Sequence, residues 1–427
     1  MRRRIFGTAA TAVVLGLLIP LAGCSGSGDG AGDSGTLRLV AAEYGDSQAT
    51  SSKTYWDKVT ADFTKANPGI KVEVQLLPWA DIDREVSRMV KAGNAPDMAL
   101  MGSYSDFAAQ GKLYSAEELL SISAEANFLQ PLAEAGSIGN TLYGLPWVAS
   151  SRLLFYNESL FSKAGINNPP KTWAELKSAA KALKDKGVKF PYALPLGPEE
   201  AHAEALIWEL SNGGGYADSS GNYSLASDQN IQTFRWVKDN LVTPGLTGPV
   251  PPSQLNRADA FAAFLRGEVG MVNGYPSLVH EARAKGISVG TVSMPVSDSL
   301  GAGEVTPTVG VADWMMAFKQ NDKGKEIGKF LDFVYQDKNM SEFAGRYHLL
   351  PSTVSASRTL DGGIDSTNTQ FLTALRGAQL YPVNDPSWVT VSDTIKRNIG
   401  RAVEPNGDAK SVLEEIASKA NEAGRKH

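Results

Sequence analysis

Apolar residues follow two alternating periods along the chain. Residues 70–76 alternate between apolar and polar, which predicts a strand, and apolar runs at 36–42 and 98–101 predict two more. Between them, apolar positions three or four apart predict helices over 55–66 and 82–92. This β-α-β-α-β order predicts a parallel sheet wrapped by helices, and therefore an α/β fold.

A capping signal marks a further helix. Thr172 and Glu175 have the spacing of a capping box, which predicts a helix beginning at Trp173. Trp173, Trp56 and Trp236 lie at core spacing in predicted helices, so we interpret all three as core residues.

The N-terminus predicts export. Three arginines at positions 2–4 precede an uncharged run over 5–19, which is too short to span a bilayer comfortably. Leu21-Ala22-Gly23-Cys24 follows, and it resembles the bacterial lipobox, whose cysteine is lipidated. Residues 1–23 are therefore interpreted as a signal peptide and Cys24 as the lipidation site. Arg3-Arg4 also resembles part of a twin-arginine signal, so the export route stays open.

The segment after Cys24 has the composition of a tether. Residues 25–35 are Gly, Ser, Asp and Ala only, so we predict a flexible tether over 24–35. No later segment is apolar and long enough for a transmembrane helix. We expect an exported protein held by lipid at the outer face of the cytoplasmic membrane.

Charge and cysteine content narrow the function classes. Removing three arginines with the signal leaves 38 basic against 46 acidic residues, a net charge of -8, which disfavours nucleic acid as a partner. With one cysteine the chain has no structural disulfide. The four histidines lie far apart in sequence, so we predict neither a metal site nor a cofactor.

Seven motifs follow one another along the chain: Asn67 to Val72, Ala92 to Asp97, Tyr143 to Trp147, Phe155 to Asn157, Pro169 to Leu176, Gly267 to Met271 and Val309 to Trp314. In this order they resemble the solute-binding proteins of ABC importers, specifically the maltose-binding-protein-like sugar-binding family. The resemblance implies a two-lobed periplasmic-binding-protein-like fold of type II, with ligand held in a cleft between the lobes. It also implies a saccharide ligand and ABC permease subunits as partners, and we expect a monomer.

The same motifs imply lobe boundaries. Lobe one would hold 36–146 plus 270–309, and lobe two 151–266 plus 316–427. Hinge crossings would lie near 147–150, 267–269 and 310–315.

Candidate ligand contacts lie in loops at the lobe edges and crossings. A saccharide offers hydroxyls at its ring edge and C–H groups on its faces, so a site needs polar side chains beside flat aromatics. The predicted substrate-binding residues are Glu43, Tyr44, Asp46, Trp79, Ser103, Tyr104, Asp106, Trp147, Arg152, Glu200, Trp208, Asn273, Tyr275, Asp313, Trp314 and Arg346.

Two other function classes stay open. The acidic residues Glu43, Asp46, Asp106 and Asp313 keep a polyamine receptor as an alternative. Carboxylate pairs also occur in glycoside hydrolases, but their separation cannot be derived from sequence. The chain contains no G-x-S-x-G and no P-loop, and we predict that it is not an enzyme.

Overall fold

The computed structural model describes residues 35–45, 47–79, 81–218, 220–301, 303–304, 306–361 and 366–425. The predicted signal peptide, Cys24 and the tether up to residue 34 lie outside the described residues, as does the candidate Asp46.

The larger sheet has seven strands, in the order β12-β6-β11-β3-β1-β2, with β13 paired to β11. Strand β1 pairs in parallel with both β2 and β3, as the sequence predicts, whereas β11 is antiparallel to β3 and β6. The strands are β1 (Leu37–Ala42), β2 (Val72–Leu77), β3 (Met98–Met101), β6 (Leu145–Ser151), β11 (Val309–Ala317), β12 (Leu350–Pro351) and β13 (Gln379–Leu380).

The second sheet has four strands, in the order β10-β7-β9-β8. Only the β8–β9 pair is parallel. The strands are β7 (Leu153–Asn157), β8 (Phe190–Ala193), β9 (Val269–Gly274) and β10 (Val289–Val292). A two-stranded ribbon is formed by β4 (Ser137–Ile138) and β5 (Thr141–Leu142).

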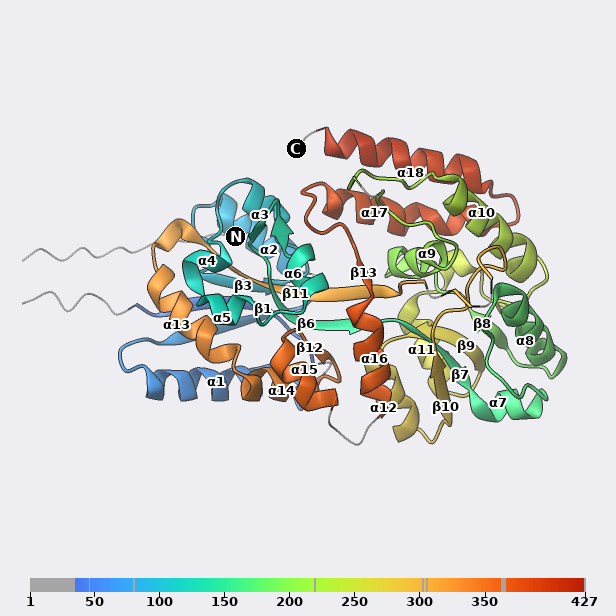
Figure 1. Ribbon diagram of the computed structural model, residues 1–427, viewed down its shortest axis with the longest axis horizontal. Coiled ribbons are helices and arrows are strands. Elements are labelled where there is room, and N and C mark those ends of the chain that lie inside the picture. Colours follow the sequence, from blue (N-terminus) through green and yellow to red (C-terminus); the bar gives the residue numbers. More distant parts are fainter. Residues whose placement is uncertain are drawn as a thin grey trace, which may run out of the picture. The chain divides into compact units, whose positions relative to one another are not determined.

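The seven-stranded and the four-stranded sheet are each flanked by helices, and Figure 1 shows β6 and β11 lying between the two groups of helices. We call the seven-stranded sheet with its helices lobe one and the four-stranded sheet with its helices lobe two. Lobe one carries α1 (Lys53–Ala66), α2 (Ile82–Lys91), α3 (Ser105–Ala109), α4 (Ala116–Leu119), α5 (Ile122–Glu125), α6 (Gln130–Ala135), η3 (Lys319–Asn321), α13 (Gly324–Val334) and α14 (Asp337–Arg346).

Lobe two carries most of the remaining helices. They are α7 (Glu158–Lys163), α8 (Trp173–Asp185), α9 (Ala201–Leu210), α10 (Asp228–Val237), η1 (Lys238–Val242), η2 (Pro252–Gln254), α11 (Arg257–Leu265), α12 (Pro276–Ala284), α17 (Trp388–Asn398), η4 (Ile399–Val403) and α18 (Ala409–Gly424). Two more, α15 (Val354–Asp361) and α16 (Ser366–Arg376), follow β12 and precede β13.

Helices α1 and α8 form where the apolar spacing predicts them, but the capping of α8 differs in one hydrogen bond. Helix α1 buries Trp56 and α8 buries Trp173, which confirms both as core residues. Thr172 caps α8 by accepting from the Glu175 backbone N–H. The Glu175 carboxylate accepts from the backbone N–H of Lys171, one residue earlier than a capping box requires.

The crossings between lobes differ from the predicted ones. Strand β6 stays paired with β11 as far as Ser151, so the chain first crosses at Arg152. It returns to lobe one between β10 and β11, within 293–308 and thus before the predicted 310–315. No crossing lies at 267–269, because β9 starts there and pairs with β7 and β8 in lobe two.

Two lobe assignments are therefore wrong. The segment 270–292, expected in lobe one, belongs to lobe two, where Met271 pairs with both Tyr156 and Tyr192. The segment 316–351, expected in lobe two, belongs to lobe one, because Phe330 of α13 packs against Phe63 of α1. Helices α17 and α18 lie in lobe two as predicted, packed on α9 and α10.

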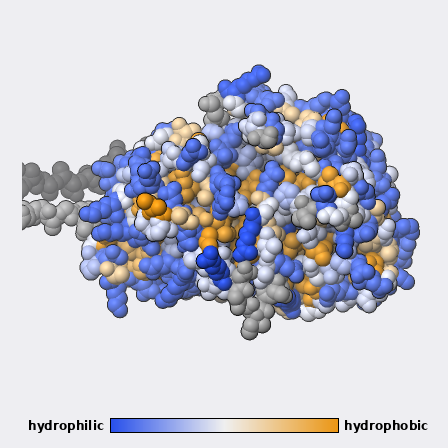
Figure 2. All heavy atoms as spheres, in the orientation of Figure 1, coloured by the Kyte–Doolittle hydropathy of each residue, from blue (hydrophilic) through white to orange (hydrophobic). Residues whose placement is uncertain are grey.

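The surface is mixed in polarity. Figure 2 shows hydrophilic residues over most of the visible face, with the hydrophobic ones in small groups. Among the described residues, the large hydrophobic side chains that are clearly exposed are Trp79, Ile122 and Val389. Within the same residues, none of the helices combines the length and the apolar character that crossing a membrane requires.

Candidate functional site

Three strand ends meet at one edge of the lobe one sheet. Tyr44 follows β1, Ser103 follows β3, and Asp313 lies in β11 beside the end of β3. Parallel strands bring their following loops to the same edge, where open α/β sheets usually bind ligands. The Tyr44 hydroxyl donates to Asp313 Oδ2 at 2.7 Å, so the register of the sheet fixes both side chains.

Asp313 is a carboxyl group with an altered protonation equilibrium. Its pKa is raised to about 7, mainly by burial; the hydrogen bond from Tyr44 opposes the rise, and the nearby charge of Asp83 adds a smaller increase. Asp313 can therefore donate as well as accept a hydrogen bond near neutral pH.

A pocket of about 410 Å³ lies between this edge and lobe two, and we call it the inner chamber. Lobe one contributes the turn after β3 and the first half of β11, and lobe two contributes one residue of α9 and one face of α17. The lining residues are Asp83, Gly102, Ser103, His202, Gly310, Val311, Ala312, Asp313, Trp314, Leu380, Tyr381, Val383, Trp388, Val389, Ser392, Asp393 and Lys396.

The lobe two wall includes several aromatic side chains. Trp388, Ser392 and Lys396 are spaced four residues apart, so they lie along one face of α17. The Trp388 ring stacks on Tyr381, with centroids 5.4 Å apart, and Tyr381 lies 4.9 Å from the His202 ring.

Three polar atoms of chamber-lining residues are buried without a hydrogen-bond partner. They are Trp314 Nε1, His202 Nδ1 and the Tyr381 hydroxyl. Burial, reinforced by the charge of Lys396, lowers the pKa of His202 to about 3, so its imidazole is neutral at pH 7. Buried polar groups are normally paired, and an unpaired one costs about 1–3 kcal/mol, so hydrogen bonds to a ligand are the expected compensation.

An ion-pair network lies next to the chamber. The buried Arg152 guanidinium donates to Glu200 at 2.7 Å and lies 4.7 Å from the centre of the Tyr275 ring. Arg257 pairs with both Glu200 and Glu199 and donates to the Tyr275 hydroxyl. Burial alone would raise the pKa of Glu200, but Arg152 and Arg257 outweigh it and lower that pKa below its usual value.

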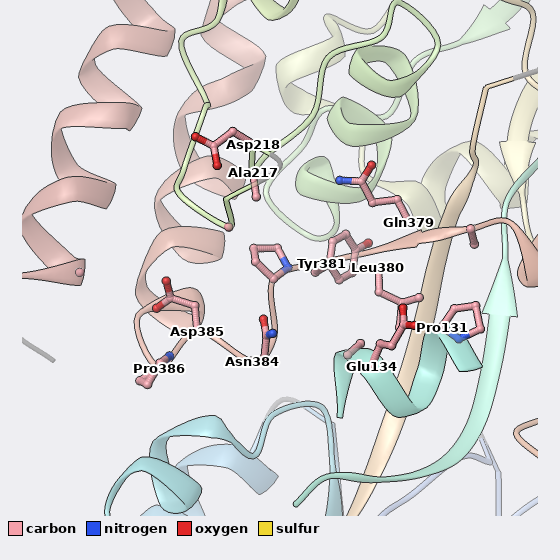
Figure 3. Close-up of a pocket in the computed structure, with 15 residues that line it drawn as sticks. Pro131, Glu134, Ala217, Asp218, Gln379, Leu380, Tyr381, Asn384, Asp385 and Pro386 are labelled. Carbon is pink, nitrogen blue, oxygen red and sulfur yellow. The ribbon is translucent and has the colours of Figure 1, made fainter. Parts of the chain in front are cut away.

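A second, wider pocket of about 810 Å³ adjoins the first, and we call it the outer chamber. Both chambers are lined by Leu380 and Tyr381. Figure 3 shows Glu134 of α6 on one side of this pocket and Asp218 on the other, with the segment through Gln379 and Pro386 between them. No lysine or arginine lines it within the described residues.

Several predicted contacts lie in or beside these pockets. Ser103, Asp313 and Trp314 line the inner chamber, and Tyr44 is bonded to Asp313. Trp79 is 40% exposed and lies edge-on to Tyr44. Arg152, Glu200 and Tyr275 form the adjoining network rather than the chamber wall.

Other predicted contacts are buried in the protein core. Trp147 stacks on Trp56 at 5.4 Å, and Trp208 packs against Trp173 while its indole donates to Glu204. Asn273 donates to the same Glu204 carboxylate, and Tyr104 donates to the Ala135 carbonyl. None of these four predicted residues lines either chamber, so the structure gives them packing and support roles.

The remaining predicted contacts also lie outside the chambers. The Glu43 carboxylate accepts from Gly45, Ser51 and Ser52 and so closes the loop before α1. Asp106 lies in the first turn of α3. Arg346 is exposed at the end of α14, in lobe one rather than the expected lobe two.

Sequence reasoning missed the lobe two wall. His202, Tyr381, Trp388 and Lys396 belong to segments that no motif singled out. One signal was present, since Trp388 follows the polar and proline-rich run 382–387, a composition typical of a loop at a lobe edge.

Comparison with known proteins shows that this chain is similar to bacterial binding proteins. A family model described as bacterial extracellular solute-binding protein matches residues 46–341. A candidate binding protein of Brucella abortus is 26% identical over 91% of this chain and 93% of its own. The sn-glycerol-3-phosphate-binding periplasmic protein of Rhizobium meliloti is 23% identical over 75% of this chain and 78% of its own.

A solved structure supports the fold. The ABC transporter solute-binding protein of Thermotoga lettingae, bound with alpha-D-tagatose, superposes with a TM-score of 0.76 at 20% identity. The match covers 91% of this chain and 99% of that one. The predicted two-lobed α/β fold is thereby confirmed.

Proposed function

Because this chain belongs to the bacterial extracellular solute-binding proteins, we propose that it is the receptor of an ABC importer for a mono- or oligosaccharide. It captures the sugar outside the cell, closes around it and delivers it to permease subunits in the membrane. The chain performs no chemistry on the sugar.

One observation carries the choice of a saccharide. Three residues that line the inner chamber, Trp314, His202 and Tyr381, each carry a buried polar atom without a hydrogen-bond partner. A sugar supplies hydroxyls that can satisfy such atoms, and C–H groups that pack on aromatic side chains. The outer chamber offers room for further sugar units beyond Tyr381.

The charges disfavour a phosphorylated solute. Arg152 and Arg257 are both engaged by glutamates, which leaves Lys396 as the cation that lines the inner chamber in the described part of the chain. Phosphate recognition generally uses several free donors or a helix N-terminus aimed at the anion. The acids Asp83 and Asp313 would repel it, whereas Asp393 is already paired with Arg397.

A cationic solute is the second candidate, since Asp83 and Asp313 line the inner chamber without an ion-pair partner among the described residues. A polyamine would gain from them, and it would lose affinity as added salt screens the attraction.

We further propose that lipid on Cys24 holds the mature chain at the outer face of the membrane. Two acyl chains give stable attachment where one is marginal. Mass spectrometry of membrane-extracted protein would test the anchor, and an unlipidated mature N-terminus elsewhere would refute it.

A thermal-shift and calorimetric panel tests the ligand class. It contains glucose, maltose, maltotriose, spermidine and sn-glycerol 3-phosphate. A ligand at 100 times its Kd adds about 2.7 kcal/mol of stability, which is readily measured. We expect a neutral sugar to raise the melting temperature; a shift with spermidine alone would select the cationic alternative.

A further inference from the structure

The face of α17 that lines the inner chamber carries a single cation. Lys396 lies one turn beyond Ser392 and two turns beyond Trp388 on this face. Asp393, on the same helix, is already paired with Arg397 at 2.8 Å. Lys396 is therefore the charge that lobe two presents to the chamber without a partner of its own.

The opposite wall carries acids. Asp83 projects from α2 and Asp313 from β11, both in lobe one. The two carboxyl groups influence each other, because the charge of Asp83 raises the pKa of Asp313. Burial raises the pKa of Asp83, and the charge of Lys396 opposes that rise, so the two groups interact across the pocket.

The two opposite charges are close but not in contact. Within the described residues, neither Lys396 nor Asp83 forms an ion pair or hydrogen bond, although each contributes to the same pocket of about 410 Å³. A small rotation of one lobe toward the other would shorten the distance between them, and opposite charges attract more strongly as they approach.

We propose that Lys396 of α17 and Asp83 of α2 form a charge latch across the inner chamber, which strengthens as the lobes close on ligand. The inference rests on the proposed receptor function. It adds a pair of residues that favour the closed state and that need not touch the sugar.

The latch has a specific consequence for binding. A ligand that binds the closed state better shifts the population toward closure, and any contact made only in that state adds to its apparent affinity. Salt screens the latch, since the Debye length falls from about 30 Å at 0.01 M to about 3 Å at 1 M. Binding of an uncharged sugar should therefore weaken with added salt.

The test compares titrations at these two salt concentrations for the full chain and for Lys396→Met. The probe is whichever of glucose, maltose or maltotriose binds, none of which carries a charge. We expect the wild-type Kd to rise about fivefold at high salt, which corresponds to the upper end of the free energies found for partly exposed ion pairs. The Kd of Lys396→Met should stay nearly constant. Lys410→Met, which removes an exposed lysine from α18, is the matched control and should keep the wild-type salt response.

Asp83→Asn provides the second half of a double-mutant cycle. It should remove the same salt response, and the double variant should lose little beyond either single one. Equal salt responses in the wild type and Lys396→Met would overturn the latch.

A measurement without ligand separates this proposal from the receptor function. Spin labels on cysteines placed at Lys325 of α13 and Lys419 of α18 report the distance between the lobes. We expect a larger closed fraction at low salt in the wild type than in Lys396→Met. An identical distance distribution in both proteins refutes the latch, whereas failure of every sugar in the panel refutes the saccharide receptor and leaves this readout intact.

Discussion

The inner chamber and the Arg152 network lie side by side, but they differ in their buried polar atoms. Those of the network are paired within the protein, whereas several of those in chamber-lining residues are not. In the network, Arg152, Glu200 and Arg257 satisfy one another within the protein. In the chamber, the Tyr381 hydroxyl and Trp314 Nε1 are buried and unpaired. The two regions are close enough for the charge of Glu200 to raise the pKa of Tyr381, after the larger effect of burial.

This difference separates support from recognition. A closed network contributes stability and fixed geometry, but it has nothing left to offer a ligand. Unpaired atoms destabilise the free protein and are compensated only when a partner arrives. Arg152 shows the first role: its backbone N–H donates to Val309 and its carbonyl accepts from Thr308, so it connects the first two crossings.

Of the changes in these two regions, breaking the network has the largest expected effect. Arg152→Ala leaves Glu200 buried with one partner fewer, and we expect a loss of about 3 kcal/mol in the free energy of unfolding. Urea unfolding measures it. Lys58→Ala, which breaks an exposed pair with Glu342, should cost less than about 1 kcal/mol and serves as the control.

Trp388→Ala should lower affinity as well as stability, because this side chain is buried and stacks on Tyr381. It removes an aromatic side chain from the chamber wall, and we expect sugar binding to weaken by about 2 kcal/mol, or roughly 30-fold. Isothermal titration checks this. Trp147→Ala, in the core of lobe one, should lower stability by about 3–5 kcal/mol, because it leaves a cavity. An unchanged affinity in Trp388→Ala would move the ligand out of the inner chamber.

Tyr381→Phe removes a single unpaired hydroxyl and keeps the ring. We expect affinity to fall by about 1 kcal/mol, roughly fivefold, with stability unchanged or slightly improved. Titration and melting curves on the same sample separate the two quantities. A clear loss of stability without any loss of affinity would show that the hydroxyl has an internal partner.

The smallest effect is a pH dependence of stability. The pKa of Asp313 is raised to about 7 in the folded chain, against about 3.9 when unfolded, so the folded state binds more protons. The stability linked to this group is therefore full below about pH 4 and is lost as pH rises through 7. Because Asp313 is partly exposed, we expect a loss of about 1 kcal/mol over this range.

Asp313→Asn should flatten that part of the profile, as measured by urea unfolding at several pH values. Glu204, whose pKa burial raises to about 7, contributes a slope of the same sign that remains in the variant. A wild-type profile that falls from pH 4 to 7 by no more than the variant's would show that Asp313 titrates normally.

The sequence by itself determined the local structure and one wall of the site. The helical spacing of apolar residues predicted that Trp56 in α1 and Trp173 in α8 are buried, and both are. The parallel strands β1, β2 and β3 also formed where the sequence predicted them. Loops that follow parallel strands reach the same edge of a sheet, so the placement of Tyr44 and Ser103 at one edge followed from their position after β1 and β3.

Only the tertiary structure decided which lobe each later segment joins. Every residue of strand β9 is buried, so burial alone fits either sheet, and pairing with β7 and β8 placed it in lobe two. The two chamber-lining aromatics Tyr381 and Trp388 reach the chamber through packing of α17 on α9, across about 180 residues of chain. Periodicity describes contacts within an element, whereas the opposite wall, the latch partners and the unpaired atoms arise from contacts between distant ones.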